Sequence, residues 1–533
     1  MKLFTNGKIV NIKNSQVQYN ESMLVFEGKI LWIGNDKSYE KYDIKETIDL
    51  EGNLVLPGFN DSHMHFVGIG LALSGCDLSG VKSIGEIKDR CKKYIEEKNP
   101  KWLVGRGWNQ DNFQDKTLPS LEDMNEVSRD IPIFLKRVCG HIAVVNRAVI
   151  DLLIESNIDL EGELFGRDEN GDLDGIVKEQ ALDQVQYFVP EPSVEDYENY
   201  ILSAQEKCLE LGLTSVQTDD FCVTTFDNID RILKAYENLV ERNKLKIKVN
   251  HQSLMRNQLE LEKFLAMGFS YGLEKGNFKI GPIKILADGS LGARTAYMKE
   301  VYNDDKTTRG VLAIKEEELK NLIFKSNEKG FPVAVHGIGS GTIDLTLSLI
   351  KAVGDKSLRN SIVHSQITDL EIFDKYKESG AMAHIQPIFL DYDLHIVRDR
   401  VGDKMAESSY NFKRYIDMDI MMAFGSDAPV ETMDVFKGLH CAVNRTDLNN
   451  WPEGGYVPSQ KISVEEGIEA YTSSGAYACY EENYKGKLLP GYYADFIVIE
   501  NNIFEENTEK LKDNRVMKTY CDGELYYERE KHK

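Results

Sequence analysis

The chain has 533 residues, of which 42% are hydrophobic and 28% charged, which indicates a globular protein long enough for a large buried core. Its formal net charge of -23 disfavours nucleic acid and anionic membranes as partners, because the field of the protein would repel both. We expect neither a signal peptide nor a membrane span, and the eight scattered cysteines, without a CxxC pair, favour a reducing, cytoplasmic compartment.

Both ends of the chain are β-rich. The N-terminal runs are KLFTNGKIVNIKN, SMLVFEGKILWIGN and ETIDLEGNLVLPG, and the C-terminal runs are ADFIVIENN, RVMKTYCDG and ELYYERE. Turn dipeptides such as Asn-Gly and Glu-Gly separate the N-terminal strands. Neither group has enough strands to bury a core alone, so we expect one small β-sandwich domain built from residues 1–55 and 480–533.

The middle of the chain alternates short apolar runs with amphipathic helical stretches. The runs lie at residues 54–59, 214–218, 246–252, 281–288, 332–337, 361–365, 381–387 and 420–427. Eight apolar strands in βα order predict an α/β fold, a (β/α)8 TIM-like barrel over residues 56–479, with a doubly wound open sheet as the alternative.

One connection in this pattern is far too long. About 150 residues separate the first two runs, whereas βα linkages are usually short. We therefore expect residues 76–190 to be an insertion after the first barrel strand. In a barrel such an insertion follows the carboxyl end of the strand, where it can cover an active site as a lid.

The first candidate metal ligands are His63 and His65, which follow PGFND at a strand end. Residues two apart in an extended segment point to the same face. Two imidazoles at this spacing can converge on one cation, which favours zinc or a similar borderline metal.

Lys284 lies inside the apolar run GPIKILAD. A lysine there either extends its ammonium group to water along a buried stem or has a depressed pKa. In the second case the amine can react with carbon dioxide to give a carbamate, whose oxygens could bridge two metals. Glu179, inside the expected insertion, is a rival for that bridging role.

Three more strand ends carry metal-ligand side chains. His336 ends PVAVHG, His364 ends SIVHS, and Asp427 follows the last apolar run in GSDAP. A single histidine in an apolar strand is more often a core residue, but two on successive strands favour a site. A divalent metal lowers the pKa of water and polarises a carbonyl, and Asp427 could then act as base and afterwards as acid.

This set of residues resembles the metal-ligand set of the amidohydrolase superfamily. The expected small sheet domain, and the GKLLPGYYADFIVIE stretch that leads into it, are also similar to those of that superfamily. The motifs GRGWNQDNF, CGHIAVVN, IKILADGSLGARTA, AVHGIG and GSDAPV are similar to those of its YtcJ-like branch, which includes N-substituted formamide deformylase. The resemblance covers essentially the whole chain. It implies a metal pair, with His63 and His65 on one ion, His336 and His364 on the other, and carboxylated Lys284 between them.

The resemblance also implies a substrate pocket lined by Trp108, Asn109, Asp111, His141 and Arg294. Plain packing for Trp108 and a solvated charge for Arg294 are the alternatives. Gln217 stands where the branch suggests a histidine, and His251, His384 and His440 are secondary candidates in barrel segments.

The leading interpretation is a metal-dependent hydrolase that cleaves a non-peptide carbon–nitrogen bond of a small amide, including N-substituted formamides. One alternative is a cyclic-amide hydrolase, deaminase or ester hydrolase with the same metal chemistry, because fold does not fix substrate. The other is a non-catalytic regulatory protein, which the full set of six ligand positions disfavours. The expected cofactor is zinc, one or two ions per chain, and a homodimer follows from the resemblance alone.

Overall fold

The computed structural model describes residues 1–13, 16–138, 141–162 and 164–530. The chain forms two compact units. Unit 1 comprises Met1–Gly68 and Ala204–Lys533, and unit 2 comprises Ile69–Ser203. The sheets formed by both termini belong to the same unit as the barrel.

Unit 1 is built on eight parallel strands that are hydrogen-bonded in chain order. They are β8 (Phe59–Met64), β15 (Leu213–Thr218), β16 (Lys248–Leu254), β18 (Phe278–Leu286), β19 (Val333–Gly337), β20 (Ser361–His364), β21 (Met382–Ile385) and β22 (Met422–Phe424), with the short β17 (Glu274–Lys275) paired to β18. Most residues of these strands are buried, as expected for a parallel sheet covered on both faces. The α/β barrel predicted from the sequence is confirmed.

The barrel closes between its last and first strands through main-chain and carboxylate contacts. The Asp427 N–H donates to the His63 carbonyl at 2.8 Å, and the His65 N–H donates to the Ala428 carbonyl at 2.8 Å. Oδ1 of Asp61 accepts from the His63 N–H at 3.0 Å and the Ser426 N–H at 3.1 Å. Closure therefore places the residues around His63 beside those around Asp427.

A glycine makes this close approach possible. A Cβ at Gly425 would lie 2.6 Å from the His63 nitrogen, which is closer than real Cβ atoms come to such a group. Gly425 is therefore required where β22 ends against β8.

The first apolar run was expected to be one barrel strand, and this prediction is wrong. Leu54–Pro57 forms β7, which pairs with β2 and β23 in a sheet of the termini, and the barrel strand β8 begins only at Phe59. Pro57 has no N–H to donate, and the chain changes sheets at Gly58. Hydrophobicity does not distinguish the two strands, because both are buried.

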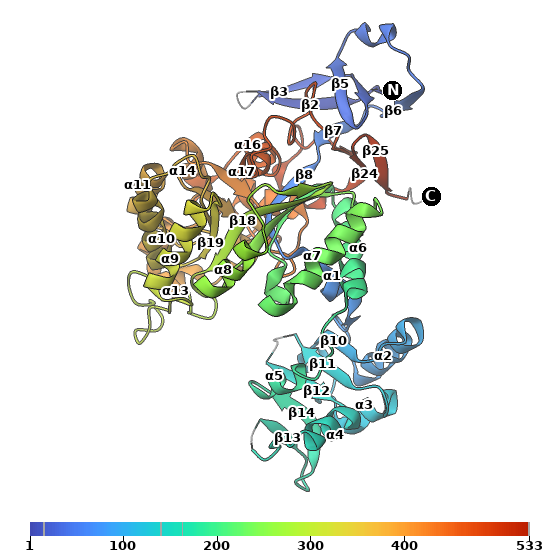
Figure 1. The fold of residues 1–533 in the computed structure, drawn as a ribbon, viewed down its shortest axis with the longest axis vertical. Coiled ribbons are helices and arrows are strands. Elements are labelled where there is room, and N and C mark those ends of the chain that lie inside the picture. Colours follow the sequence, from blue (N-terminus) through green and yellow to red (C-terminus); the bar gives the residue numbers. More distant parts are fainter. Residues whose placement is uncertain (14–15, 139–140, 163, 531–533) are drawn as a thin grey trace. The chain divides into compact units, whose positions relative to one another are not determined.

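Helices connect the barrel strands, and α8, α9, α10 and α11 lie outside β18 and β19 (Figure 1). α11 shows how the sequence sets the ends of such a helix: the Asp369 side chain accepts from the Ile372 N–H at its start, and Gly380 adopts φ 72° at its end.

No helix in the described part of the chain is long and apolar enough to cross a membrane. The helices are α1 (Phe66–Ser74), α6 (Val194–Glu210), α7 (Ile229–Glu241), α8 (Gln258–Ala266), α9 (Glu316–Glu328), α10 (Ser340–Val353), α11 (Leu370–Ser379), α12 (Leu390–Asp393), α13 (Val397–Glu407), α14 (Phe412–Asp417), α15 (Val435–Asn444), α16 (Val464–Ala470) and α17 (Ser473–Ala478).

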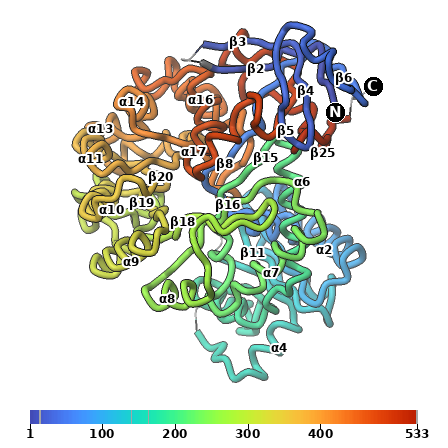
Figure 2. The backbone as a smooth tube through the Cα atoms, turned by 45° about the horizontal axis from the view of Figure 1, so that its top comes forward, coloured from blue at the N-terminus to red at the C-terminus, as the bar shows by residue number. Residues whose placement is uncertain are grey.

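Two further sheets of unit 1 are built from the chain ends, which lie side by side in Figure 2. The first has the order β5-β4-β1-β6 and contains β1 (Lys2–Thr5), β4 (Ser22–Phe26), β5 (Lys29–Gly34) and β6 (Glu46–Asp49). The second has the order β25-β24-β23-β7-β2-β3 and contains β2 (Lys8–Lys13), β3 (Gln16–Asn20), β7, β23 (Phe496–Ile499), β24 (Val516–Cys521) and β25 (Glu524–Glu528). Both contribute to one apolar core that includes Phe4, Val25, Val55 and Phe496. A separate domain of residues 1–55 and 480–533 stays a prediction.

Unit 2 contains most of the segment between β8 and β15 and has its own six-stranded sheet of order β13-β14-β12-β11-β10-β9. Its elements are β9 (Cys76–Asp77), α2 (Ile84–Lys98), β10 (Leu103–Trp108), α3 (Leu121–Val127), β11 (Ile133–Arg137), β12 (Ile142–Val145), α4 (Arg147–Glu155), β13 (Phe165–Arg167), β14 (Leu173–Lys178) and α5 (Ala181–Gln186). Two apolar clusters, one on α2 and α3 and one on α4 and α5, bury this sheet. A role of residues 76–190 as a lid stays a prediction.

Candidate metal centre

The structure brings all six predicted ligand residues together at the carboxyl ends of the barrel strands. Nε2 of His63 and His65 lie 3.4 and 3.1 Å from Oδ1 of Asp427. The Lys284 Nζ lies 3.2 Å from His63 Nε2. The ring of His364 is 5.6 Å from that of His63 and 4.4 Å from that of His336, between centroids. The site therefore combines four imidazoles, one amine and one carboxylate.

Each histidine has one ring nitrogen engaged with an oxygen acceptor. These bonds are His63 Nδ1 to Gln252 Oε1 at 2.6 Å, His65 Nδ1 to the Asp219 carbonyl at 2.9 Å, His336 Nε2 to the Gly289 carbonyl at 3.1 Å, and His364 Nδ1 to Gln386 Oε1 at 2.8 Å. A nitrogen that donates to oxygen carries the proton, so the other nitrogen of each neutral ring keeps its lone pair. Such outer contacts are the usual way in which proteins orient histidines toward a metal. The chemistry of this donor set fits a divalent metal.

Charge and burial set the protonation states of these histidines and so determine whether they can bind a cation. Burial and the neighbouring Lys284 hold the pKa of His63 well below its usual range, and burial and His336 do the same for His364. Burial alone would lower the pKa of His65, but its hydrogen bond to Asp427 raises it well above the usual range. Two imidazoles are therefore neutral, while a proton is held between His65 and Asp427, where a metal ion could replace it.

Lys284 is fully buried within β18, and burial lowers the pKa of its amine to about 8 even though Asp219 and Asp427 lie nearby. At pH 7 about a tenth of the amine is therefore uncharged, far more than for an ordinary lysine. The uncharged form is the one that can react with carbon dioxide. The lowered pKa therefore favours carbamate formation at Lys284 relative to an exposed lysine.

The backbone is strained where two of these side chains leave the barrel. His364 adopts φ 77° and Asp427 adopts φ 60°, both in the left-handed region that non-glycine residues seldom occupy. Such conformations cost about 1–3 kcal/mol each and occur preferentially at functional sites. Their presence at two of the six positions supports a functional role for this cluster.

Gln252 and Gln386 were missed by sequence reasoning, although each occurs close to a histidine in HQS and HIQP. Gln252 donates its Nε2 to the Ser62 carbonyl at 3.1 Å, which turns its oxygen toward His63. Gln386 donates to the His384 carbonyl at 3.3 Å and turns its oxygen toward His364 in the same way.

We expect Gln252→Leu to weaken metal binding by about 10–100-fold, because His63 loses the acceptor that fixes its tautomer. Competition with a chelator measures this affinity directly. Gln252→Glu should retain most of it, since a carboxylate also accepts from Nδ1. Gln217→Leu is the matched control, because Gln217 is equally buried but bonds Asn60 and the Gly475 carbonyl. Equal affinities for Gln252→Leu and wild type would refute the orienting role.

Three of the residues predicted to line the substrate pocket lie on β10 and the turn after it in unit 2. Trp108 is fully buried in the core of that unit and donates its Nε1–H to the Leu135 carbonyl at 2.9 Å, which favours packing. Arg137 donates to Asn109 Oδ1 and Asp111 Oδ2, both at 2.8 Å. The Arg137 guanidinium thus fixes the side chains of Asn109 and Asp111. A contact of these two residues with a substrate stays a prediction.

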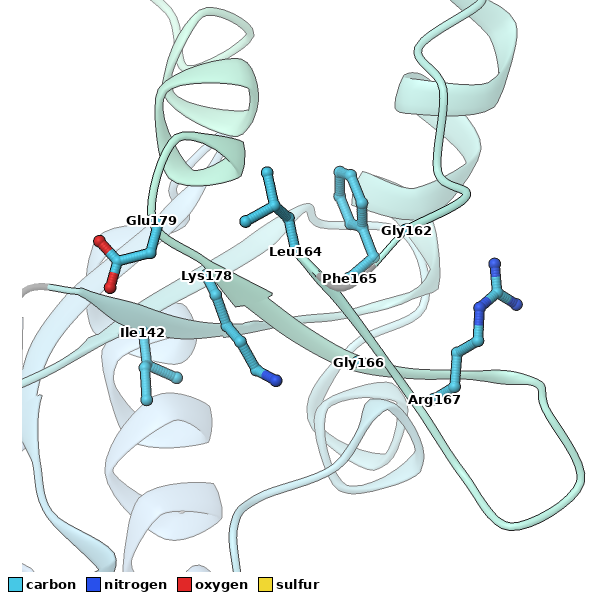
Figure 3. Close-up of a pocket in the computed structure, with 8 residues that line it drawn as sticks. All are labelled: Ile142, Gly162, Leu164, Phe165, Gly166, Arg167, Lys178 and Glu179. Atoms are coloured by element: carbon cyan, nitrogen blue, oxygen red, sulfur yellow. The ribbon is translucent and has the colours of Figure 1, made fainter.

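His141 and Glu179 also belong to unit 2, and His141 Nδ1 lies 3.2 Å from Glu179 Oε2. The preceding residues of the CGH motif, Cys139 and Gly140, lie outside the described residues. Glu179 lines an open hollow of about 730 Å³ (Figure 3). Its lining residues are Ile142, Gly162, Leu164, Phe165, Gly166, Arg167, Lys178 and Glu179. None of the six barrel residues lines this hollow, and the bridging role of Glu179 stays a prediction.

Arg294 follows β18 and forms a two-point ion pair with Asp304, at 3.0 and 2.8 Å. Its guanidinium is thus engaged by a carboxylate, and its role toward a substrate also stays a prediction. Gln217 bonds Asn60 and Gly475 rather than any of the six cluster residues. Asp219, which directly follows β15, contributes to the cluster instead, because its carbonyl lies 2.9 Å from Nδ1 of His65.

The secondary histidines are buried and bonded within the protein. Nδ1 of His384 lies 2.8 Å from the Ser62 carbonyl, Nδ1 of His251 lies 3.0 Å from Ser253 Oγ, and Nε2 of His440 lies 3.1 Å from the Asp447 carbonyl. The groups of metal-ligand side chains found in the described part of the chain contain none of them. These positions favour structural roles.

His251 should make the protein less stable in acid. Burial lowers its pKa to about 4 from the ordinary 6.5, so the unfolded chain takes up a proton between these values that the folded chain does not. The stabilisation is complete above about pH 6.5 and is lost as the pH falls toward 4, by about 2 kcal/mol between pH 7 and 5. Urea unfolding of wild type and His251→Met at both pH values measures the difference. An equal loss in the two proteins would contradict the assignment.

A barrel whose strand ends bring together histidines, a lysine and an aspartate defines the class of protein, a metal-dependent hydrolase. The sequence profile of the Amidohydrolase family matches residues 46–527, and the chain belongs to that family. It is therefore an enzyme that hydrolyses carbon–nitrogen bonds other than peptide bonds.

Similar proteins extend over nearly the whole chain. The Bacillus subtilis (strain 168) protein "Putative amidohydrolase YtcJ" is 31% identical, over 99% of this chain and 100% of its own length. The crystal structure of an uncharacterized metal-dependent hydrolase from Pyrococcus furiosus superimposes with a TM-score of 0.80 at 31% identity, covering 95% of this chain and 100% of that one. The N-substituted formamide deformylase of Arthrobacter pascens is 22% identical over 99% of this chain and 98% of its own length.

Proposed function

We propose that this protein hydrolyses the amide bond of a small N-substituted amide, with N-substituted formamides as the first candidates. The observation that carries the proposal is the position of Asp427, whose carboxylate lies within 3.4 Å of both His63 Nε2 and His65 Nε2. A general base must lie within hydrogen-bond reach of the water it deprotonates. Asp427 meets this requirement because its carboxylate lies beside the two imidazoles that are candidate ligands of one ion.

The chain's own residues account for the proton movements. A divalent metal, when bound, supplies a water of lowered pKa and polarises the substrate carbonyl. Burial raises the pKa of Asp427, but the neighbouring His364 and the hydrogen bond from His65 together lower it below its usual range, so the carboxylate is ionised and can accept a proton from the attacking water. Asp427 then delivers that proton to the leaving nitrogen, which departs as a neutral amine.

We propose zinc as the metal and a carbamate on Lys284 as an oxygen ligand between two ions. Imidazole and carboxylate donors suit zinc, and the lowered amine pKa of Lys284 supports the carbamate. His63 and His65 would hold one ion and His336 and His364 the other, as the family resemblance implies, and the proximity of Asp427 to both first histidines makes it a further candidate ligand.

The substrate class is supported by the relative from Arthrobacter pascens, whose name is N-substituted formamide deformylase. A cyclic-amide hydrolase, deaminase or ester hydrolase is the second candidate, because the same barrel chemistry serves each of these bonds. We further propose a cytoplasmic enzyme with a small-molecule substrate and no nucleic-acid or membrane partner. The net charge of -23 and the free cysteines of the described chain support this setting, while a homodimer rests on the resemblance alone.

A substrate panel tests the proposal. Purified metal-loaded protein is incubated with N-alkyl and N-aryl formamides, cyclic amides, aminated heterocycles and aryl esters, and formate, amine and ammonia are quantified. We expect formate and amine in equal amounts from a formamide, and their loss after chelation of the metal. Ammonia from a heterocycle, or acid from an ester without any formamide turnover, would replace the proposal with the corresponding alternative.

A further inference from the structure

A second group of metal-ligand atoms lies on the other edge of the His65 imidazole. Cys222 Sγ is 3.2 Å from His65 Nδ1 and 3.2 Å from the Asp219 carbonyl. One ligand atom from each of His65, Asp219 and Cys222 lies within 4.8 Å of the other two. The hydrolase centre uses Nε2 of the same ring, so the two groups share His65 and face its opposite nitrogens.

The Asp219 carboxylate provides an independent indication of a cation site. Asp219 is 2% exposed, and its Oδ1 has no hydrogen-bond partner among the described residues. Its neighbour Asp220 is equally buried but accepts from the Val67 N–H, the Thr218 hydroxyl and the Tyr236 hydroxyl at 2.6–2.8 Å. Leaving a buried carboxylate oxygen without a donor is costly, and a cation beside it would remove that cost.

Cys222 supplies a ligand that the hydrolase centre lacks. It follows β15 in the turn at Phe221–Val223 and is exposed, whereas the other described cysteines are buried. A cation can therefore reach its sulfur from solvent. Thiolate sulfur prefers soft and borderline cations such as zinc and cadmium over hard ones such as magnesium.

We propose that His65, Asp219 and Cys222 form a second metal site that binds a soft divalent cation through nitrogen, oxygen and sulfur. Binding forms a metal–sulfur bond as the Cys222 thiol releases its proton, and a metal–nitrogen bond as His65 Nδ1 releases its own. The hydrogen bond from His65 Nδ1 to the Asp219 carbonyl is lost at the same time.

A consequence for activity rests on the proposed function. His65 can no longer be oriented by the Asp219 carbonyl once its Nδ1 holds a cation, so its Nε2 changes both direction and charge. Filling of the second site should therefore inhibit the hydrolase. Excess zinc would act in this way as an inhibitor at a position distinct from that of the catalytic metal.

Cadmium titration of the metal-loaded protein tests the site without any substrate. Bound cadmium is measured by elemental analysis after desalting, and the metal–sulfur bond by its thiolate-to-cadmium absorption in the ultraviolet. We expect about one cadmium per chain beyond the resident metal, with this absorption. Cys222→Ser should lose the absorption, and Asp219→Asn should weaken binding by at least about tenfold.

Cys479→Ala is the matched control, since Cys479 is a buried thiol of unit 1 that belongs to neither group of ligand atoms, and it should behave as wild type. Absorption that persists in Cys222→Ser would overturn the site, and Asp219→Asn with wild-type affinity would overturn the three-ligand assignment. Because occupancy is read without turnover, failure of the proposed function is a separate result. Cadmium that fills the site without inhibiting hydrolysis would overturn the regulatory consequence.

Discussion

Asp427→Asn should reduce kcat/KM for the substrate found in the panel by about 10²–10⁴-fold, the usual contribution of a general acid–base group. The amide has nearly the same shape as the carboxylate but cannot take a proton from water or return one to the leaving nitrogen. It also removes the negative charge beside His63 and His65. Steady-state kinetics together with metal content would separate loss of the base from loss of the metal.

Asp434→Asn is the matched control for this substitution. Asp434 lies after the same strand, where its side chain accepts from the Phe436 N–H at the start of α15, and asparagine serves equally well in that position. This variant should keep wild-type kinetics. Asp427→Asn with more than about a tenth of wild-type activity would refute Asp427 as the proton carrier.

Lys284→Met should lower the metal content by about one ion per chain, because an apolar side chain of similar length cannot supply an anionic oxygen between two metals. The rate of substrate hydrolysis should fall together with the metal content. Elemental analysis of wild type and variant, prepared in parallel with added bicarbonate, measures the change. The variant should fold, since residue 284 is only 2% exposed and the substitution removes a buried amine.

Lys284→Glu is the matched variant that restores an anionic oxygen at this position. Its carboxylate takes the place of the carbamate on a shorter stem, and it should retain more metal than Lys284→Met does. If Lys284→Met instead binds as much metal as wild type, Lys284 is a packing residue and the centre does not depend on a carbamate.

The proximity of the six candidate ligands could be predicted because parallel barrel strands all bring their carboxyl ends to one face. His336 and His364 each lie at the end of an apolar run, and His63 and His65 stand two residues apart in HMH, so local patterns were sufficient to select them. Lys284 was recognisable as a charge inside a buried strand. For these residues the sequence positions alone implied a common location.

Other features depended on pairings that no local pattern reveals. Leu54–Pro57 and β8 are both buried and adjacent, and only their partners show that one belongs to the terminal sheet and the other to the barrel. Trp108 was a candidate for the substrate pocket because of its motif, yet its indole is buried against β11. The burial of the Trp108 side chain depends on the neighbouring strands of unit 2, which no local pattern around Trp108 reveals.

The sequence by itself determined the fold class, the identity of the six side chains and their order along the barrel. Only the tertiary structure decided how the ring nitrogens of each histidine are engaged, because the acceptor that orients each ring lies on or just after another barrel strand. Gln252 is 189 residues from His63, and Asp219 is 154 residues from His65. A lone pair points toward a cation only when such long-range hydrogen bonds fix both the tautomer and the ring. The chemistry of the site is therefore encoded locally, and its geometry is set by the closed barrel.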